Sequence, residues 1–110
     1  MKEIDFKKGN GLVPSIIQDW KTNEVLMLGY MNEEAFKNTV DNGFVYFFSR
    51  SRKSIWLKGE TSGNKLLVKE IYLDCDNDAI LVKAKLIGNC VCHTGNKSCF
   101  FNKYETRRTI

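Results

Sequence analysis

Short segments rich in β-branched and aromatic residues make up most of this chain, and only one segment carries the signals of a helix. Asn32 can cap a helix start, Glu33 and Glu34 suit its positive end, and Gly43 can end it. We therefore expect one helix between positions 32 and 43. Its expected buried side chains are Ala35, Phe36, Thr39 and Val40.

The remaining pattern predicts strands. Pro14 lacks an amide hydrogen, so we expect the first strand to lie at a sheet edge. Short polar turns predict a hairpin between the first two strands and another between the last two. The result is an α+β fold dominated by about six strands, with one main helix. The predicted strands are residues 12–18, 24–31, 44–49, 54–58, 65–73 and 79–87.

Size and composition place these elements in one domain. The chain has 110 residues, 43% hydrophobic and 27% charged, within the range of an ordinary single globular domain. No apolar run approaches the ~20 residues that cross a membrane, and the N-terminus lacks the apolar core of a signal peptide. We expect a cytoplasmic protein without a membrane segment. The net charge of +4 permits an anionic ligand but does not require nucleic acid.

Four cysteines are too few for a disulfide framework, and in a reducing compartment they are typical of free thiols or metal ligands. Cys92 and Cys99 are separated by six residues and can ligate zinc, with Cys75 as the natural third thiolate. Three protein ligands and a water describe a catalytic zinc site, whereas a fourth ligand, Cys90 or His93, describes a structural one. The alternative is that all four thiols are small buried apolar groups.

His93 is the only histidine in the chain. It is too close in sequence to the Cys92 thiolate for easy co-ligation, but it can sit beside a metal-bound water. Histidine is the side chain whose reference pKa, about 6.5, suits a general base near neutral pH. An isolated histidine is also often a packed or surface residue.

Asp74, Asp76 and Asp78 alternate along the chain, so a continuing strand would point all three carboxylates to one face. Such a group suits Mg²⁺ or Ca²⁺. An EF-hand is excluded because Ala79 and Lys85 occupy the positions of its glycine and its bidentate glutamate. A simple polar turn is the alternative.

A basic run from Ser49 to Lys53 precedes Trp56 and a glycine-containing loop. Arginine and serine side chains bind phosphate, glycine lets backbone amides approach it, and tryptophan can stack on a base. The alternative is a solvated basic turn with Trp56 in the core.

Together these clusters resemble the phosphoribosyl-AMP cyclohydrolase family over about residues 11–101. The resemblance begins with Gly11-Leu12-Val13-Pro14 and Tyr30-Met31-Asn32-Glu33-Glu34-Ala35. Its most distinctive run is Ser49-Arg50-Ser51-Arg52, Trp56 and Lys58-Gly59-Glu60-x-Ser62-Gly63. Asp74-Cys75-Asp76-x-Asp78 and Cys92-His93-Thr94-Gly95-x-x-Ser98-Cys99-Phe100 complete it.

The resemblance implies hydrolytic opening of the adenine ring of N1-(5-phosphoribosyl)-AMP at its N1–C6 bond, in histidine biosynthesis, by a zinc-activated water. It implies an intertwined homodimer with zinc ligands from both subunits, Mg²⁺ assisting substrate binding, and no fused pyrophosphohydrolase domain in residues 1–110. His93 would be catalytic. The implied zinc ligands are Cys75, Cys92 and Cys99, and the magnesium ligands Asp74, Asp76 and Asp78. The expected substrate-binding residues are Arg50, Arg52, Trp56, Lys58, Glu60, Ser62 and Gly63.

Two positions depart from the family pattern. Cys90 is an additional thiol, which we interpret as non-ligating, and Gly29 stands where alanine is common. Two other functions compete with the cyclohydrolase hypothesis. A zinc-stabilised module that binds nucleic acid would use the basic run and Trp56. A zinc purine deaminase would need His-x-Glu and Pro-Cys-x-x-Cys motifs, which this chain lacks.

Overall fold

The computed structural model describes residues 3–107, which form one compact domain dominated by strands. The prediction of six strands and one helix is confirmed. Most element boundaries lie within one residue of those expected, although the third strand begins two residues late. In chain order the elements are β1 Val13–Asp19, β2 Val25–Met31, α1 Glu33–Asn42, β3 Tyr46–Ser49, β4 Ser54–Leu57, β5 Lys65–Leu73 and β6 Ile80–Ile87.

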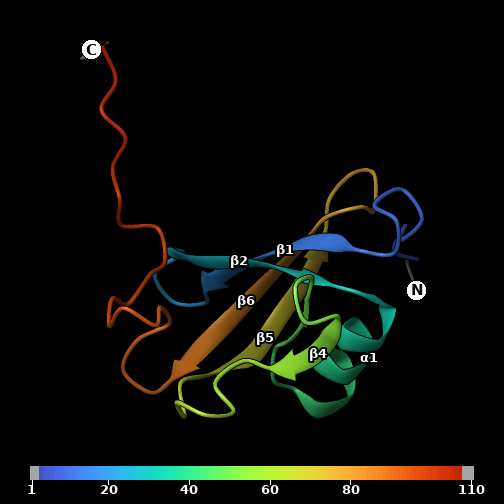
Figure 1. The fold of residues 1–110 in the computed structure, drawn as a ribbon, viewed down its shortest axis with the longest axis horizontal. Helices are drawn as coiled ribbons and strands as arrows, with labels where there is room; N and C mark the ends of the chain where they lie inside the picture. The colour runs from blue at the N-terminus through green and yellow to red at the C-terminus, as the bar shows by residue number, and fades with distance from the viewer. Residues whose placement is uncertain (1–2, 108–110) are drawn as a thin grey trace.

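Four strands form the main sheet in the order β2-β1-β6-β5, and β3 and β4 form a separate hairpin (Figure 1). Both predicted hairpins, β1–β2 and β5–β6, are antiparallel, whereas β1 and β6 pair in parallel. The prediction that the first strand is an edge strand is wrong, because β1 lies inside the sheet. Pro14 is tolerated there because the pairing with β6 begins only at Ser15, one residue later.

One face of the main sheet, the inner face, carries the hydrophobic core. Ile17 and Val82 pair across β1 and β6 and are fully buried. Phe47 from β3 packs over β2 at Gly29, where an added Cβ would lie 2.5 Å from the Phe47 ring. Glycine at this position therefore lets the β3–β4 hairpin approach the sheet closely. The core consists of Val13, Ile17, Leu26, Met31, Ala35, Val45, Phe47, Leu66, Ile80, Val82, Ala84 and Val91.

The helix begins and ends as predicted. The Asn32 side chain accepts a hydrogen bond from the Ala35 amide at 2.8 Å, and Gly43 ends the helix with a φ of 79°. Ala35 and Thr39 are buried as expected, but Val40 is 53% exposed, so its placement in the buried stripe is wrong. Successive side chains of a helix are about 100° apart around its axis. Because Thr39 points into the core, the next side chain, Val40, points away from it.

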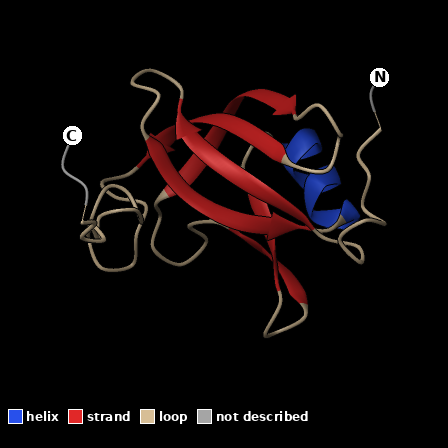
Figure 2. Ribbon diagram, turned by 90° about the horizontal axis from the view of Figure 1, so that it is seen from above, coloured by secondary structure: helices blue, strands red, loops and turns tan. Residues whose placement is uncertain are grey.

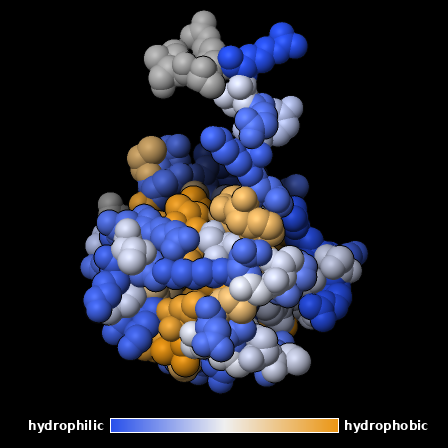
Figure 3. All heavy atoms as spheres, turned by 90° about the vertical axis from the view of Figure 1, so that its left-hand side faces the viewer, coloured by the Kyte–Doolittle hydropathy of each residue, from blue (hydrophilic) through white to orange (hydrophobic). Residues whose placement is uncertain are grey.

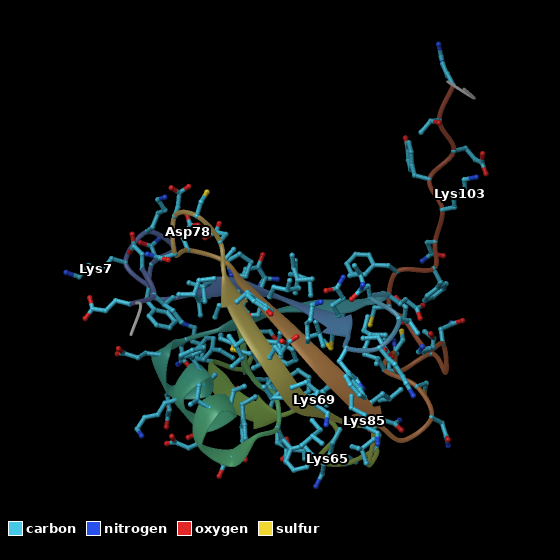
Figure 4. All side chains as sticks on the ribbon, turned by 180° about the vertical axis from the view of Figure 1, so that it is seen from behind. Lys7, Lys65, Lys69, Asp78, Lys85 and Lys103 are labelled. Carbon is cyan, nitrogen blue, oxygen red and sulfur yellow. The ribbon has the colours of Figure 1, made fainter. Side chains whose placement is uncertain are left out.

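The two ends of the main sheet are occupied by different kinds of segment. The helix and the N-terminal segment lie toward one end, and the loops that follow β6 lie toward the other (Figure 2). Asp78, in the turn between β5 and β6, is at the end opposite the C-terminal arm that carries Lys103 (Figure 4). No helix within residues 3–107 has the length and apolar character needed to cross a membrane.

Candidate active site

Residues 88–99, which we call the cysteine loop, are irregular as predicted but are fixed by hydrogen bonds. The Cys92 amide donates to the Asn96 carbonyl at 3.1 Å, which closes a tight turn. The Cys99 amide donates to the Leu26 carbonyl on β2 at 2.7 Å. The Ser98 hydroxyl donates to the Val25 carbonyl, also on β2, at 2.7 Å. The loop is therefore held against the edge of the main sheet, and Cys92 and Cys99 are brought together.

Cys92 and Cys99 lie close enough for each thiol to influence the pKa of the other. The Thr94 hydroxyl donates to the Cys92 sulfur at 3.0 Å, and this bond is the main reason that the pKa of Cys92 is lowered. Burial raises the pKa of Cys99, and the neighbouring Cys92 raises it further. The pair therefore ionises first at Cys92, a pattern that suits a soft metal ligand.

Lys58 lies beside both cysteines. Its ammonium group donates to the Val91 carbonyl at 2.8 Å, directly before Cys92 in the chain. Its charge favours ionisation of both thiols and is a smaller influence on their pKa values than the hydroxyl and burial effects. The sequence suggested only phosphate binding for Lys58, whereas the structure also gives it a bond that holds the cysteine loop.

A cavity of about 350 Å³ opens between β4, the loop after it and the cysteine loop. It brings together most of the predicted catalytic and substrate-binding residues. Trp56 is half-buried, and its ring centroid lies 5.5 Å from that of Phe47, so it is both a core contact and a cavity wall. The predicted site residues that line the cavity are Arg52, Trp56, Lys58, Glu60, Ser62, His93 and Cys99. Residues that the sequence did not single out include Met27, Leu57, Thr61 and Val91.

A second hollow of about 360 Å³ adjoins the first and shares Met27, Arg52 and Trp56 with it. Arg50 lines this second hollow, where its guanidinium lies 4.1 Å from the centre of the Tyr30 ring. Gly63 is not among the lining residues of either hollow. The predicted substrate-binding set is thus divided between two neighbouring spaces, with Arg52 and Trp56 between them.

Residues 74–79, which we call the acidic turn, connect β5 to β6. The strand ends at Leu73, so the expected continuation that would point three carboxylates to one face is wrong. The Asp74 carboxylate accepts hydrogen bonds from the amides of Asp78 at 2.9 Å and Ala79 at 3.3 Å. Asp74 therefore braces the turn, as its alternative interpretation predicted.

The other acidic residues of the turn face a different environment. The Asp78 carboxylate pairs with the Lys8 ammonium at 2.9 Å, and this hydrogen bond is the main reason that the pKa of Asp78 is lowered. Asp76 and Cys75 are exposed. Cys75 shares a shallow hollow with Tyr72 and Asp74.

The chain does not bring its three predicted zinc ligands together. Cys75 follows the end of β5, and the cysteine loop follows the far end of β6, so they lie at opposite ends of the main sheet (Figure 1). Within residues 3–107, no group of three histidine, cysteine or acidic side chains is arranged to hold a metal ion. The described chain therefore offers a pair of neighbouring thiols, Cys92 and Cys99, and a separate exposed thiol, Cys75.

Sequence reasoning missed three hydrogen bonds of the cysteine loop, one made by Thr94 and two made by Asn64. Thr94 lies inside the Cys-His-Thr-Gly motif, and a hydroxyl two residues after a cysteine in a tight turn is a local signal for such a bond. The Asn64 amide donates to the Cys90 sulfur at 3.6 Å. The Asn64 side-chain oxygen also accepts from the Asn89 amide at 3.0 Å, which ties the loop after β4 to the cysteine loop.

Comparison with known proteins agrees with the composition of this site. The family profile described as phosphoribosyl-AMP cyclohydrolase matches residues 27–101. The chain is 57% identical over 102 residues to the phosphoribosyl-AMP cyclohydrolase of Solibacter usitatus, covering 93% of this chain and 81% of that protein. It is 55% identical over 103 residues to that of Desulforapulum autotrophicum, covering 94% and 82%. It is 54% identical over 101 residues to that of Clostridium botulinum strain 657, covering 92% and 91%. The chain belongs to the phosphoribosyl-AMP cyclohydrolase family.

Proposed function

We propose that this chain hydrolyses the N1–C6 bond of N1-(5-phosphoribosyl)-AMP in histidine biosynthesis, with zinc supporting the chemistry and Mg²⁺ supporting substrate binding. The observation that carries the proposal is the single cavity that collects a guanidinium, an ammonium, an indole, an imidazole and a thiol. These groups match the phosphates, the purine and the reacting carbon of such a substrate. Family membership supports the same reaction.

Arg52 is the main candidate to bind phosphate, because it lines both hollows and its fork of donors suits phosphate oxygens. Lys58 adds positive charge while holding the Val91 carbonyl. Trp56 offers a flat surface for the purine. Arg50, Glu60, Ser62 and Gly63 remain in the proposed substrate-binding set, with Arg50 acting from the adjoining hollow.

The donor chemistry of the cysteine loop fits zinc. Cys92 and Cys99 are adjacent free thiols, and the pKa of Cys92 is lowered by the Thr94 hydroxyl. We propose that Cys75 of a second subunit completes the ligand set, since the Cys75 of the same chain lies at the other end of the sheet. When bound, zinc would supply Lewis acidity that makes a water nucleophilic near neutral pH.

The reaction requires a proton to move as bonds change at the purine. A C6–O bond forms and the N1–C6 bond breaks. One proton of the attacking water passes to the departing N1, and the other passes to the exocyclic nitrogen on C6, so that C6 becomes a carboxamide carbon. His93 is exposed in the cavity wall next to the cysteine pair, and we assign this proton transfer to its imidazole. Arg52 and Trp56 would hold the substrate in place during the step.

The acidic turn fits Mg²⁺ only in part. Asp76 is exposed, but one oxygen of Asp74 already accepts two backbone amides, and Asp78 is paired with Lys8. We propose that Asp74, Asp76 and Asp78 hold the ion together with water and substrate phosphates, which is the usual manner for Mg²⁺. The ion pair between Lys8 and Asp78 would then break when Mg²⁺ binds.

Two measurements test this function. Purified protein incubated with phosphoribosyl-AMP should change the ultraviolet absorbance of the purine, and a zinc chelator should stop that change. Mixing Cys75→Ser protein with Cys92→Ser protein under conditions that exchange subunits tests whether the zinc site is shared. About a quarter of the wild-type zinc should return, because half of the dimers are mixed and each has one complete site. Absence of turnover with zinc-loaded protein would refute the activity, and no recovery of zinc would refute the sharing.

A further inference from the structure

The loop after β4, residues 58–64, and the cysteine loop meet at one side of the domain, where they are yellow-green and orange in Figure 1. Figure 3 looks onto this side, and hydrophobic surface lies open there between hydrophilic side chains. Asn89 and His93 are exposed, so burial alone does not fix the cysteine loop. Exposed segments with few buried contacts open most easily. The hydrogen bonds of the cysteine loop therefore decide where His93 lies.

The cysteine loop contains a closed turn, residues 91–97, with His93 near its middle. The Val91 amide donates to the Lys97 carbonyl at 3.0 Å, which makes the turn a single unit. On the C-terminal side of the turn, the bond from the Cys99 amide to β2 fixes the loop to the main sheet. The orientation of the turn then depends on what holds its N-terminal side.

The side chain of Asn64 holds the two residues that precede this turn. Its oxygen accepts a hydrogen bond from the Asn89 amide at 3.0 Å, and its amide group donates to the Cys90 sulfur at 3.6 Å. Lys58 adds its bond to the Val91 carbonyl at 2.8 Å. Because the two bonds of Asn64 use both ends of one planar group, they fix the orientation of the cysteine loop as well as its distance.

Two glycines allow the backbone to come close to Asn64 from both sides. A Cβ at Gly88 would overlap the side-chain oxygen of Asn64, and a Cβ at Gly59 would overlap its carbonyl oxygen. Both glycines also have positive φ angles, 128° and 86°. The fold therefore excludes side chains on either side of Asn64, and the spacing of the two loops is fixed at this residue.

Asn64 is not among the residues that line the cavity of the candidate active site. Its neighbours Lys58 and Glu60 line the cavity from the loop after β4, and His93 lines it from the cysteine loop. Asn64 thus connects the wall that carries the proposed substrate-binding groups to the wall that carries the imidazole. Any influence of Asn64 on the reaction acts through these residues.

We propose that Asn64 is a positioning residue, whose two hydrogen bonds set the place of His93 against the purine bound in the cavity. This inference deepens the proposed function and rests on it for the role of His93. Without the Asn64 side chain, the closed turn keeps its attachment to β2 and pivots about it. A displacement of about 1 Å in a reacting group can cost about a hundredfold in rate, so a small pivot is enough.

Steady-state kinetics of zinc-loaded proteins test the positioning. Asn64→Ala removes both hydrogen bonds, and kcat per bound zinc should fall by about 10- to 100-fold. KM for phosphoribosyl-AMP should stay within about threefold of wild type, because Arg52 and Trp56 are unaltered. Asn64→Asp keeps an acceptor for the Asn89 amide and should recover most of the lost kcat. Asn38→Ala is the matched control, because Asn38 is also half-buried but lies on α1.

Hydrogen exchange followed by nuclear magnetic resonance gives a readout that does not depend on activity. The Asn89 amide should exchange at least about tenfold faster in Asn64→Ala than in wild type and stay protected in Asn64→Asp. The Cys99 amide, which is bonded to β2, is the internal control and should not change. If Asn64→Ala does not fold, Asn64→Gln replaces it. Its longer side chain cannot fit between Gly59 and Gly88 at the same spacing, so it should also lower kcat.

The outcomes separate this inference from the proposed function. A low kcat with unchanged KM and a fast Asn89 amide, both reversed in Asn64→Asp, supports the positioning role. Unchanged kcat in Asn64→Ala overturns it even when the variant is less stable, because Asn64 is then structural only. A protected Asn89 amide in Asn64→Ala, or a slow Asn64→Asp enzyme in which this amide is protected, overturns it as well. Absence of turnover by zinc-loaded wild-type protein refutes the proposed function and the kinetic part of this inference, and the Asn89 amide then decides whether Asn64 holds the cysteine loop.

Discussion

The cysteine loop and the acidic turn were both predicted as metal-binding segments, yet they are built in different ways. In the cysteine loop, backbone bonds to β2 and the Thr94 hydroxyl hold the thiols of Cys92 and Cys99 near each other. In the acidic turn, Asp74 is used to close the turn and Asp78 is paired with Lys8. The loop therefore presents two free thiols in a fixed arrangement, whereas two of the three carboxylates of the turn already have hydrogen-bond or ionic partners.

This difference shows why residue type alone does not define a metal site. A carboxylate that accepts backbone amides has less capacity left for a cation, whereas the Lys58 ammonium beside the two thiols has only a small influence on their pKa values. We therefore expect the cysteine loop to determine how tightly metal is bound. We expect cation binding at the acidic turn to depend on bound substrate and on a neighbouring subunit. Four experiments sharpen or break this distinction.

The largest effect should follow Cys92→Ser. Loss of one of two adjacent thiols removes the half-site, so bound zinc should fall far below one ion per chain and turnover should be lost. Metal content measured by mass spectrometry checks this. Cys90→Ser is the matched control, since Cys90 contacts Asn64 and should leave the zinc content unchanged. Full zinc in Cys92→Ser protein would contradict the ligand assignment.

His93→Ala should come next, with turnover reduced by about 10²–10⁴ while zinc stays bound. The imidazole lines the cavity but is not part of the thiol pair, so proton transfer is lost and the metal site is kept. Steady-state kinetics and metal content on the same sample measure both quantities. Unchanged turnover would show that His93 has no part in proton transfer. Loss of zinc from the variant would indicate that His93 is a zinc ligand.

Asp74→Ala and Asp76→Asn separate bracing from magnesium binding. The Asp74 carboxylate accepts hydrogen bonds from two backbone amides, and alanine removes that acceptor, so Asp74→Ala should lower the free energy of unfolding by about 1 kcal/mol. Asp76→Asn should leave stability unchanged and raise the Mg²⁺ concentration needed for half-maximal activity. Urea unfolding and a magnesium titration give the two readouts. An unaltered titration for Asp76→Asn would mean that the turn is structural only.

The smallest effect concerns the Lys8–Asp78 pair, which is exposed to solvent. Lys8 lowers the pKa of Asp78 in the folded state, so the pair stabilises the fold above the unfolded-state pKa of about 3.9. This contribution is lost as the pH falls through the lowered folded-state pKa. Lys8→Met should therefore have a slightly lower urea midpoint than wild type at about pH 7, and the difference should vanish near pH 2. A constant difference across this range would exclude the ion pair as its cause.

Local signals accounted for the elements of the fold. The Asn32 cap and the Gly43 stop were readable from the sequence, because capping depends on bonds within a few residues. The position of β1 was not readable, because pairing with β6 joins segments more than sixty residues apart. Pro14 indicated an edge strand because it has no amide hydrogen to donate. That donor is not needed for the parallel pairing with β6, because this pairing begins one residue later, at Ser15. Val40 was misplaced because the side of a helix that faces the core depends on its packing partners.

The amino-acid sequence was enough to indicate the family, the strand-dominated composition and the residue types at the site, since short motifs carry these through side-chain chemistry. The tertiary structure alone decided which of these residues meet. It placed Arg52, Lys58, His93 and Cys99 around one cavity and left Cys75 at the far end of the sheet. The direction and pairing of the strands set how far apart these residues lie. Strand pairing in turn follows from the burial of one face of the whole sheet, which no short motif encodes.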